Sequence, residues 1–320
     1  TIKAVEDVKV GDQLQGDDNQ PRNVLSLSRG KEEMFRVAPI KGEAWECNRS
    51  HILSLICNAT VNKEFHKDRV YDISVEDYLN LPKYVKHVLK LYHVGVEYPA
   101  QPVPIDPYLL GLWLGDGTTK KVGISKPDIE VKNAVLHSAE CYGLTVRTSY
   151  SSHGGCPTYH MTSGKKNGKN QFLYDLRQLN LLGNKHIPKQ YLVNSRTVRL
   201  CVLAGIIDTD GYIHNGSCEI IQKSKKLSDN IAQLARSLGF RVLVSPKIVN
   251  GEIYHRIYLS GDLSVVPTRI ARKQSPKRKQ IKDALRTGFS LTSIGKGDYY
   301  GFTIDGNRRF LLGDFTVAHN

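Results

Sequence analysis

Short alternating runs of apolar and polar residues make up the first hundred positions of the chain. The runs "NVLSLSRG", "MFRVAPI" and "HILSLIC" are separated by Gly, Asp, Asn and Pro, which favour turns, so they predict short β-strands. Residues 75–94 favour a short helix that breaks at Pro82. Four prolines then fall within residues 99–107 and predict a stiff connector between two domains.

From Tyr108 onward the pattern changes to alternating helices and strands, and it occurs twice. Each copy begins with an apolar run, "YLLGLWLGDG" in the first and "RLCVLAGIIDTDG" in the second. Each continues with β-like residues, a helix that ends at a glycine (Gly143 or Gly239) and two further strands. The copies span about residues 106–190 and 196–285, and their repetition predicts two similar halves that face each other.

The end of the chain resembles its beginning more than its middle. Eight Lys and Arg residues lie between Arg269 and Arg286, and residues 298–320 then return to β-like runs broken by turns. We therefore expect a mostly-β domain made from residues 1–100 and 291–320. An α+β domain, residues 101–290, is inserted between these two parts.

Composition narrows the functional classes. The 320 residues include 45 Lys and Arg against 31 Asp and Glu, which gives a net charge of +14. Such an excess indicates either a polyanionic binding partner or a protein that is merely basic overall. Six cysteines without a C-x-x-C pair indicate neither a disulfide framework nor a zinc site, and they fit a reducing compartment. There is no apolar run of membrane-spanning length, and "TIKAVEDVKVGD" lacks the apolar core of a signal peptide. We expect an intracellular protein that does not enter a membrane.

Two acids, Asp116 and Asp210, end the matched apolar runs, and each is followed by Gly. The small residues Gly111, Ala204 and Gly205 would let the two helices approach closely and bring the acids together. Carboxylates at helix C-termini are disfavoured by the helix dipole, and two of them side by side repel unless a divalent cation lies between them. A site with only a few protein ligands, all of them oxygen atoms, suits Mg²⁺, which takes its other ligands from water and phosphates. Such an ion can activate water beside a phosphodiester, so the paired acids predict a phosphodiesterase centre. The alternative is that both acids are ordinary turn residues.

The strings "LLGLWLGDG" and "LAGIIDTDG" resemble the paired signatures of LAGLIDADG homing endonucleases; the second departs from the namesake only at Ile206 and Thr209. The resemblance implies two pseudo-symmetric αββαββα halves whose central helices carry Asp116 and Asp210 as catalytic and metal-binding residues. It implies saddle-shaped sheets along the major groove of a long double-stranded DNA site. It also implies Mg²⁺, for which Mn²⁺ can substitute, and a monomer that cleaves DNA in the nucleus and is otherwise in the cytoplasm.

Family members often place a basic residue near each acid. By position, Lys185 matches one of them, and Lys277 is a candidate for the other, with Lys273 and Lys279 competing for the match. Each lysine has the alternative role of a solvated or phosphate-positioning charge. The sequence offers further candidates for DNA contacts: Arg147, Lys223, Arg241, Lys247, Arg256, Arg272 and Lys279.

The chain ends in His319 and Asn320. An asparagine amide can attack its own carbonyl and break the following peptide bond, and a neighbouring histidine can protonate the leaving amine. With the endonuclease, this ending resembles the C-terminal splice junction of an intein. "CNRSHILSL" resembles the internal splicing block, in which Asn48 and His51 would activate the N-terminal scissile bond. "TIKAVEDVKVGD" resembles the early strands of fungal nuclear inteins, as in vacuolar ATPase and spliceosomal-factor genes, which implies a Hint domain and flanking host segments (exteins) as partners.

Two departures from the intein pattern argue against complete splicing. The chain opens at Thr1 instead of a Cys or Ser nucleophile and matches a point inside the family's usual start, so we expect that segment to be missing. Arg308 stands two positions before Phe310, where many relatives have His, and Arg does not act as a base. Two alternatives to an intein-encoded endonuclease stay open: a degenerate intein that binds DNA without cutting, and a free-standing protein related to the mating-type switching endonuclease.

Overall fold

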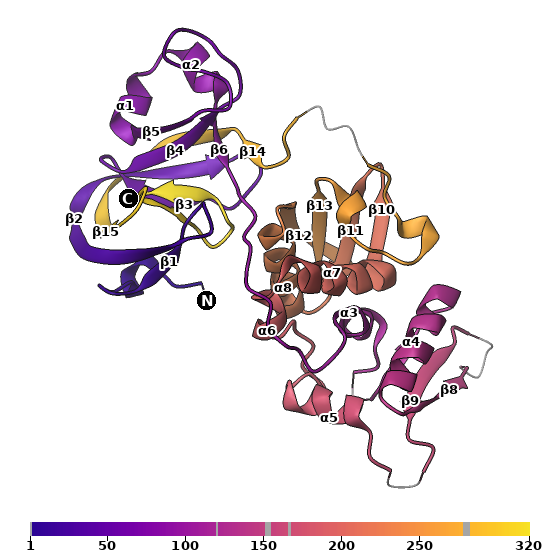
Figure 1. Cartoon of the computed structure of the whole chain (residues 1–320). Coiled ribbons are helices and arrows are strands. Elements are labelled where there is room, and N and C mark those ends of the chain that lie inside the picture. The colour runs from indigo at the N-terminus through magenta and orange to yellow at the C-terminus, as the bar shows by residue number, and fades with distance from the viewer. Residues whose placement is uncertain (1, 120, 151–154, 166–167, 278–281) are drawn as a thin grey trace. The chain divides into compact units, whose positions relative to one another are not determined.

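The computed structural model describes residues 2–320 apart from 120, 151–154, 166–167 and 278–281. The chain divides into two compact units (Figure 1). The split unit consists of Thr1–Val96 and Ile281–Asn320, and the inserted unit of Glu97–Gln280. The second boundary falls before the predicted position 290, because β14 (Arg286–Thr287) and the start of β15 pair within the split unit.

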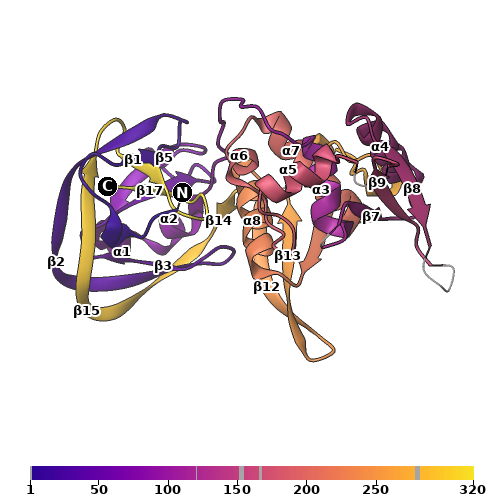
Figure 2. The same ribbon diagram turned by 90° about the horizontal axis from the view of Figure 1, so that it is seen from below.

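The split unit is mostly β and draws its strands from both ends of the chain. Strand β2 (Pro21–Pro39) pairs antiparallel with β15 (Phe289–Ile304) from Pro39↔Phe289 to Val24↔Ile304, and Figure 2 shows the two long strands curving side by side. Because β2 and β15 come from opposite ends of the sequence, this pairing closes one domain around the insertion. The shorter strands are β1 (Gln13–Gln15), β3 (Trp45–Asn48), β4 (Ile52–Cys57), β5 (Val70–Ser74), β6 (Leu89–Tyr92), β16 (Arg309–Leu311) and β17 (Val317–His319).

The described part of the split unit also contains short helical segments: η1 (Val5–Asp7), α1 (Val75–Asn80) and α2 (Lys83–Val88). The Ser74 hydroxyl accepts a hydrogen bond from the Asp77 amide and so caps α1. Pro82 is the N-cap of α2. The helical stretch is therefore interrupted at the proline, as predicted.

The inserted unit repeats one arrangement twice. The first half contains α3 (Pro107–Asp116), β7 (Gly123–Ser125), α4 (Ile129–Cys141), β8 (Thr145–Ser149), β9 (Thr158–Thr162), α5 (Gln171–Gln178) and α6 (Lys189–Leu192). The second contains α7 (Arg196–Asp210), β10 (Gly211–His214), β11 (Ser217–Gln222), α8 (Lys225–Ser237), β12 (Arg241–Val249), β13 (Glu252–Ser260), η2 (Leu263–Val265) and η3 (Ala271–Lys273). The predicted two-domain plan with a pseudo-symmetric insert is confirmed.

The two halves differ in their sheets. The second half has four strands in the order β10-β11-β13-β12, and the first has three in the order β7-β9-β8. Within the described residues, the counterpart of β10 in the first half is reduced to a bridge between Gly117 and Ile124. The symmetry is therefore approximate, and the second half carries the larger sheet.

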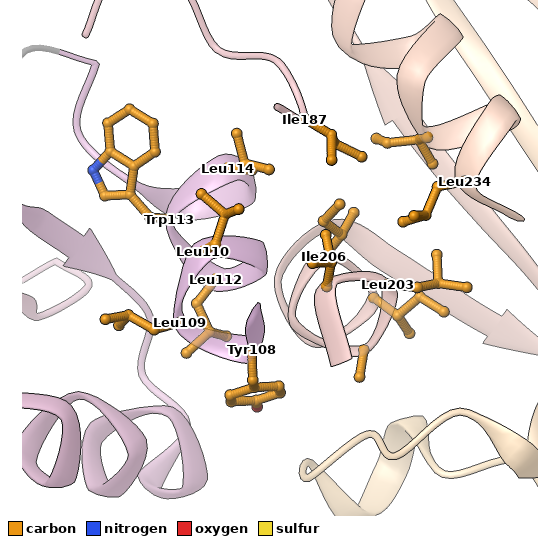
Figure 3. Packing of buried hydrophobic residues seen from close by; sticks show 14 of the residues in the cluster. Tyr108, Leu109, Leu110, Leu112, Trp113, Leu114, Ile187, Leu203, Ile206 and Leu234 are labelled. Carbon is orange, nitrogen blue, oxygen red and sulfur yellow. The ribbon is translucent and has the colours of Figure 1, made fainter. Parts of the chain in front are cut away.

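Helices α3 and α7 form the centre of the inserted unit, where one apolar core spans both halves. A methyl group added at Gly111 would lie 2.3 Å from the Val202 carbonyl oxygen, and one added at Gly205 would lie 2.3 Å from that of Tyr108. The two helices therefore touch backbone to backbone. Figure 3 shows their buried side chains, with Leu203 pointing away from α3 toward Leu234 of α8.

None of the helices in the described part of the chain combines the length and the apolar character needed to cross a bilayer.

Candidate functional site

The two acids of the matched runs lie at the C-terminal ends of α3 and α7, on the same face of the helix seam. A methyl group added at Gly115, next to Asp116, would lie 3.3 Å from Asp210 Oδ2. Lys126 Nζ lies 2.9 Å from Asp116 Oδ2 and donates a hydrogen bond of 2.5 Å to the Thr209 carbonyl oxygen. One amine therefore contacts the ends of both helices.

Asp210 has an environment that resists its charge. Burial, followed by the negative charge of Asp116, raises the pKa of Asp210 to about 6. Opposing these causes, Gln222 Nε2 donates a hydrogen bond of 2.5 Å to Asp210 Oδ2, and Lys185 and Lys126 are nearby cations. At neutral pH the carboxylate is mostly ionised, and an added positive charge beside it would be stabilised.

Lys126 and Gln222 occupy matching places in the two halves. Lys126 stands two residues before Asp128, the N-cap of α4, and Gln222 stands two residues before Ser224, the N-cap of α8. Each contacts the acid of its own half. Sequence reasoning missed both residues, although aligning the starts of the two helices would have paired them.

A second matched pair of side chains, Lys185 and Lys273, lies beside the acids. Lys185 Nζ donates 2.9 Å to the carbonyl of Gly115, and Lys273 Nζ donates 3.1 Å to the carbonyl of Thr209. Each amine is therefore bound to the residue that precedes an acid. Burial lowers the pKa of each lysine to about 8.

Lys273, which competes with Lys277 for this role in the sequence, is the lysine that the structure places beside the end of α7. Lys277 is exposed in the segment after η3, whereas Lys273, at the end of that turn, is buried against the C-terminal carbonyls of α7. The short 3₁₀ turn directs the Lys273 side chain back onto the helix end. Lys279, the other competitor, lies outside the described residues.

The donor set at the seam suits a hard divalent cation. Two carboxylates and the carbonyl groups at two helix ends are all oxygen ligands, as Mg²⁺ prefers. The described residues contain no cluster of three or more His, Cys, Asp or Glu that would form a complete metal cage. An ion at this seam would therefore take its other ligands from water or phosphate.

The open face of the second sheet carries three of the predicted DNA contacts. Lys247 on β12 and Arg256 on β13 lie 3.6 and 3.5 Å from the two carboxylate oxygens of Glu219 on β11. Lys223, just beyond β11, forms an exposed ion pair with Glu252 at 2.7 Å. Cations held across neighbouring strands form a pre-arranged positive surface.

Three other predicted contacts lie elsewhere. Arg147 is exposed on β8 of the first sheet. Arg241, at the start of β12, is buried, with 7 % of its surface exposed, and it stays a predicted DNA contact. Arg272 on η3 is paired through two guanidinium nitrogens with the carboxylate of Asp128.

The predicted splicing residues all lie in the split unit. His51 Nε2 and His319 Nδ1 are shielded from solvent and have no hydrogen-bond partner among the residues described. Burial, followed by the nearby His319, lowers the pKa of His51 to about 4. Asn48 Nδ2 donates to Glu32 and Ser50.

The C-terminal residue is held by its backbone: the Asn320 amide donates 2.8 Å to the Arg308 carbonyl oxygen. Burial lowers the pKa of His319, while the negative charge of Asp72 opposes that change. His319 also lies near enough to His51 for its charge to lower the pKa of His51, so the structure brings these two predicted splicing residues close together.

The fold and the site define a two-domain protein with a split β unit and an inserted unit whose two halves meet at paired acids. Residues 1–101 match the family described as Hom_end-associated Hint, and residues 186–275 match the family described as Homing endonuclease. The chain therefore has the make-up of an intein with an embedded homing endonuclease domain.

Three curated proteins are similar to parts of the chain. The replicative DNA helicase DnaB of Mycobacterium intracellulare is 32% identical over 49% of this chain and 23% of its own length. The homothallic switching endonuclease of Saccharomyces cerevisiae is 26% identical over 65% and 42%. The catalytic subunit of the V-type proton ATPase from Candida tropicalis is 24% identical over 67% and 25%. The chain thus spans less than half the length of these relatives.

Among solved structures, the homing endonuclease I-DmoI in complex with DNA and Mn is 15% identical and has a TM-score of 0.38. The match covers 49% of this chain and 89% of I-DmoI.

Proposed function

We propose that the inserted unit is a site-specific DNA endonuclease that breaks both strands of double-stranded DNA with the help of Mg²⁺, for which Mn²⁺ can substitute. The observation that carries this proposal is the meeting of Asp116 and Asp210 at one helix seam. Lys126 bridges the two helix ends, and a further lysine lies beside each acid, half-buried Lys185 in the first half and buried Lys273 in the second. Each acid serves one strand.

The residues of the seam divide the work. Asp116 and Asp210 hold the cation, which when bound lowers the pKa of a water molecule and stabilises the leaving oxygen. Lys185 and Lys273 offer a positive charge to the scissile phosphates, and their pKa values of about 8 keep most of it at neutral pH. Gln222 and Lys126 orient the two carboxylates through their direct contacts.

The positive surface of the second sheet would bind the DNA. Lys223, Lys247 and Arg256 present cations across adjacent strands, and Arg147 extends the cationic surface to the first sheet. Neutralising phosphates releases counterions, which fits a chain with a net charge of +14. We propose that the protein binds a long site as a monomer and acts in the nucleus.

The test is cleavage of a plasmid library of random inserts by the purified chain with Mg²⁺, followed by sequencing of the cut ends. The proposal expects one long sequence, cut in both strands, and no cutting when Mg²⁺ is chelated. Enrichment of one sequence by gel shift without any cut ends would favour the alternative, a degenerate protein that only binds DNA.

A second function is favoured by the shielded His319 beside Asn320. We propose that the split unit breaks the peptide bond after Asn320 when a host segment follows it, with His319 assisting the attack of the asparagine amide on its own carbonyl. The anchored Asn320 backbone and the nearby His51 support this proposal. Release of a downstream protein fused to Asn320 tests it, and an absence of release would favour the free-standing endonuclease.

A further inference from the structure

One segment of the inserted unit, Thr268–Lys273, contacts both halves at the face where the acids meet. We propose that this segment is a clasp that positions Asp116 relative to Asp210 by fastening the C-terminal end of α7 to the first half. The proposal rests on the proposed nuclease function, because it explains how the two acids keep their relative place.

The centre of the clasp is Asp208, a fully buried carboxylate two residues before Asp210. Its Oδ2 accepts hydrogen bonds of 2.7 Å from the Tyr108 hydroxyl and of 2.7 Å from the Arg269 amide, and its Oδ1 accepts one of 3.4 Å from the Ile270 amide. Tyr108 belongs to α3 of the first half, whereas the two amides belong to the clasp. A buried carboxylate is costly unless donors satisfy it, so this arrangement has one favoured geometry.

The clasp also closes on itself and on the helix end. The Thr268 hydroxyl donates 3.2 Å to the Lys273 carbonyl oxygen, which joins the two ends of the segment. Lys273 Nζ donates to the carbonyls of Ile207, Asp208 and Thr209 at 2.9, 2.7 and 3.1 Å. The last turn of α7 is therefore held by both a side chain and the backbone of the clasp.

Two cationic side chains of the clasp reach the first half. The Arg269 guanidinium lies 3.9 Å from the centre of the Tyr108 ring. Arg272 pairs with Asp128, the N-cap of α4, and its second nitrogen donates 3.0 Å to Asp128 Oδ2. Asp128 follows Lys126 by two residues, so the Arg272 pair fixes the segment that presents Lys126 to Asp116.

These contacts define positioning residues. Within the described part of the chain, Asp208, Arg272 and Asp128 form no hydrogen bond or ion pair with Asp116 or Asp210. Asp208 lies two residues before Asp210, and Asp128 lies two residues after Lys126. Arg272 acts through its ion pair with Asp128. A shift of about 1 Å between reacting groups can cost a hundredfold in rate, so a loosened clasp should impair the concerted cutting of two strands. Arg272 is exposed and Asp208 is fully buried, so a substitution at Arg272 tests the positioning role with less effect on folding than one at Asp208.

The experiment is a charge swap in the full chain. R272D and D128R are each expected to slow conversion of nicked plasmid to linear product by about tenfold. The double variant R272D/D128R is expected to recover to within about threefold of the wild type, because the pair is restored with reversed charges. Asp128 makes no side-chain hydrogen bond to the helix it caps, so D128R removes no cap. A double variant as slow as the single variants would overturn the proposal.

The matched control is the Lys225–Asp229 pair, 2.7 Å apart and wholly within α8. K225D and D229K should leave the ratio of nicked to linear product unchanged. An equal accumulation of nicked DNA in these variants would assign the effect to surface charge and overturn the positioning role.

Hydrogen exchange tests the clasp without DNA. In the wild type, the Arg269 and Ile270 amides should exchange slowly, and D208A should speed both, while exchange in α4 stays slow. Fast exchange of both amides in the wild type would overturn the clasp. If both amides are protected yet the wild type cuts no DNA, the nuclease function fails and the positioning role is overturned with it.

Discussion

The Lys126 amine lies 2.9 Å from the carboxylate of Asp116, and it places a positive charge beside this acid. At the matching place in the second half Gln222, a neutral amide, donates to Asp210. The two acids therefore differ in electrostatic environment although their backbones are related by the internal repeat. An endonuclease built this way should treat its two DNA strands unequally.

The first prediction follows from this asymmetry. Lys126→Met removes the cation in direct contact with Asp116 and should slow cutting of one strand by about a hundredfold. The other strand should be slowed less, because Lys126 contacts the helix end beside Asp210 only through the Thr209 carbonyl. Gel analysis of a target labelled separately on each strand measures both rates. Lys225→Met, at an exposed position of α8, is the control. Equal slowing of both strands would show that Lys126 is not specific to one acid.

The second prediction concerns the acids themselves. Asp116→Asn and Asp210→Asn should each reduce double-strand cutting by more than about a hundredfold while largely preserving binding, because an amide holds a cation poorly and the DNA surface is unchanged. Linearisation of target plasmid and a gel shift measure the two properties. Normal linearisation by either variant would remove that acid from the site.

The third prediction uses the raised pKa of Asp210, about 6 in the metal-free protein. A carboxyl whose pKa is higher in the folded than in the unfolded state destabilises the fold when it is ionised. The free energy of unfolding therefore falls as the pH rises from the unfolded-state pKa toward 6, and the full loss is present above pH 6. At pH 7.5 the cost is roughly 3 kcal/mol. Asp210→Asn should therefore raise the melting temperature of the metal-free protein by at least about 5 °C.

Calorimetry at pH 7.5 in chelator checks that expectation, with Asp229→Asn, on the exposed side of α8, as the control. Added Mg²⁺ should stabilise the wild type and narrow the difference, since it binds the ionised carboxylate of the folded state. A variant that melts below the wild type in chelator would show that the buried charge at Asp210 is not a cost.

The features that depend only on short stretches of the sequence were predictable. The helix-ending acids Asp116 and Asp210, the small residues at the seam and the glycines that close α4 and α8 at positive φ (62° at Gly143, 86° at Gly239) all lie within repeated strings. The split of the β domain was also predictable, because both chain ends share one turn-punctuated pattern. Their pairing through β2 and β15 confirms that expectation.

The missed features depend on where side chains meet in space. Lys273 contacts the end of α7 from the 3₁₀ turn η3, and a run of similar lysines in the sequence hides which one does so. Gln222 is uncharged, so its residue type does not indicate in the sequence that it binds Asp210.

The fourth prediction tests the backbone contact between α3 and α7. Gly205→Ala would place a methyl group 2.3 Å from the Tyr108 carbonyl oxygen, a backbone atom that cannot move aside without separating the helices. We expect a loss of about 3 kcal/mol in the free energy of unfolding, measured by urea titration. Gly297→Ala is the control, because its methyl group would meet only the flexible Met34 side chain, 3.0 Å away. A loss under about 1 kcal/mol at Gly205 would mean that the helices have room at this crossing.

The last prediction concerns the end of the chain. When a reporter protein is fused after Asn320, Asn320→Ala should abolish its release, because alanine has no amide to attack the carbonyl. His319→Ala should slow release by about a hundredfold, since the imidazole is shielded at the junction and next to the reacting residue. His66→Ala, whose imidazole binds the Lys63 carbonyl within the split unit, should have no effect. Gel electrophoresis and mass spectrometry follow the freed reporter over time. Release from Asn320→Ala at the wild-type rate would exclude cyclisation and leave hydrolysis at another bond as the source.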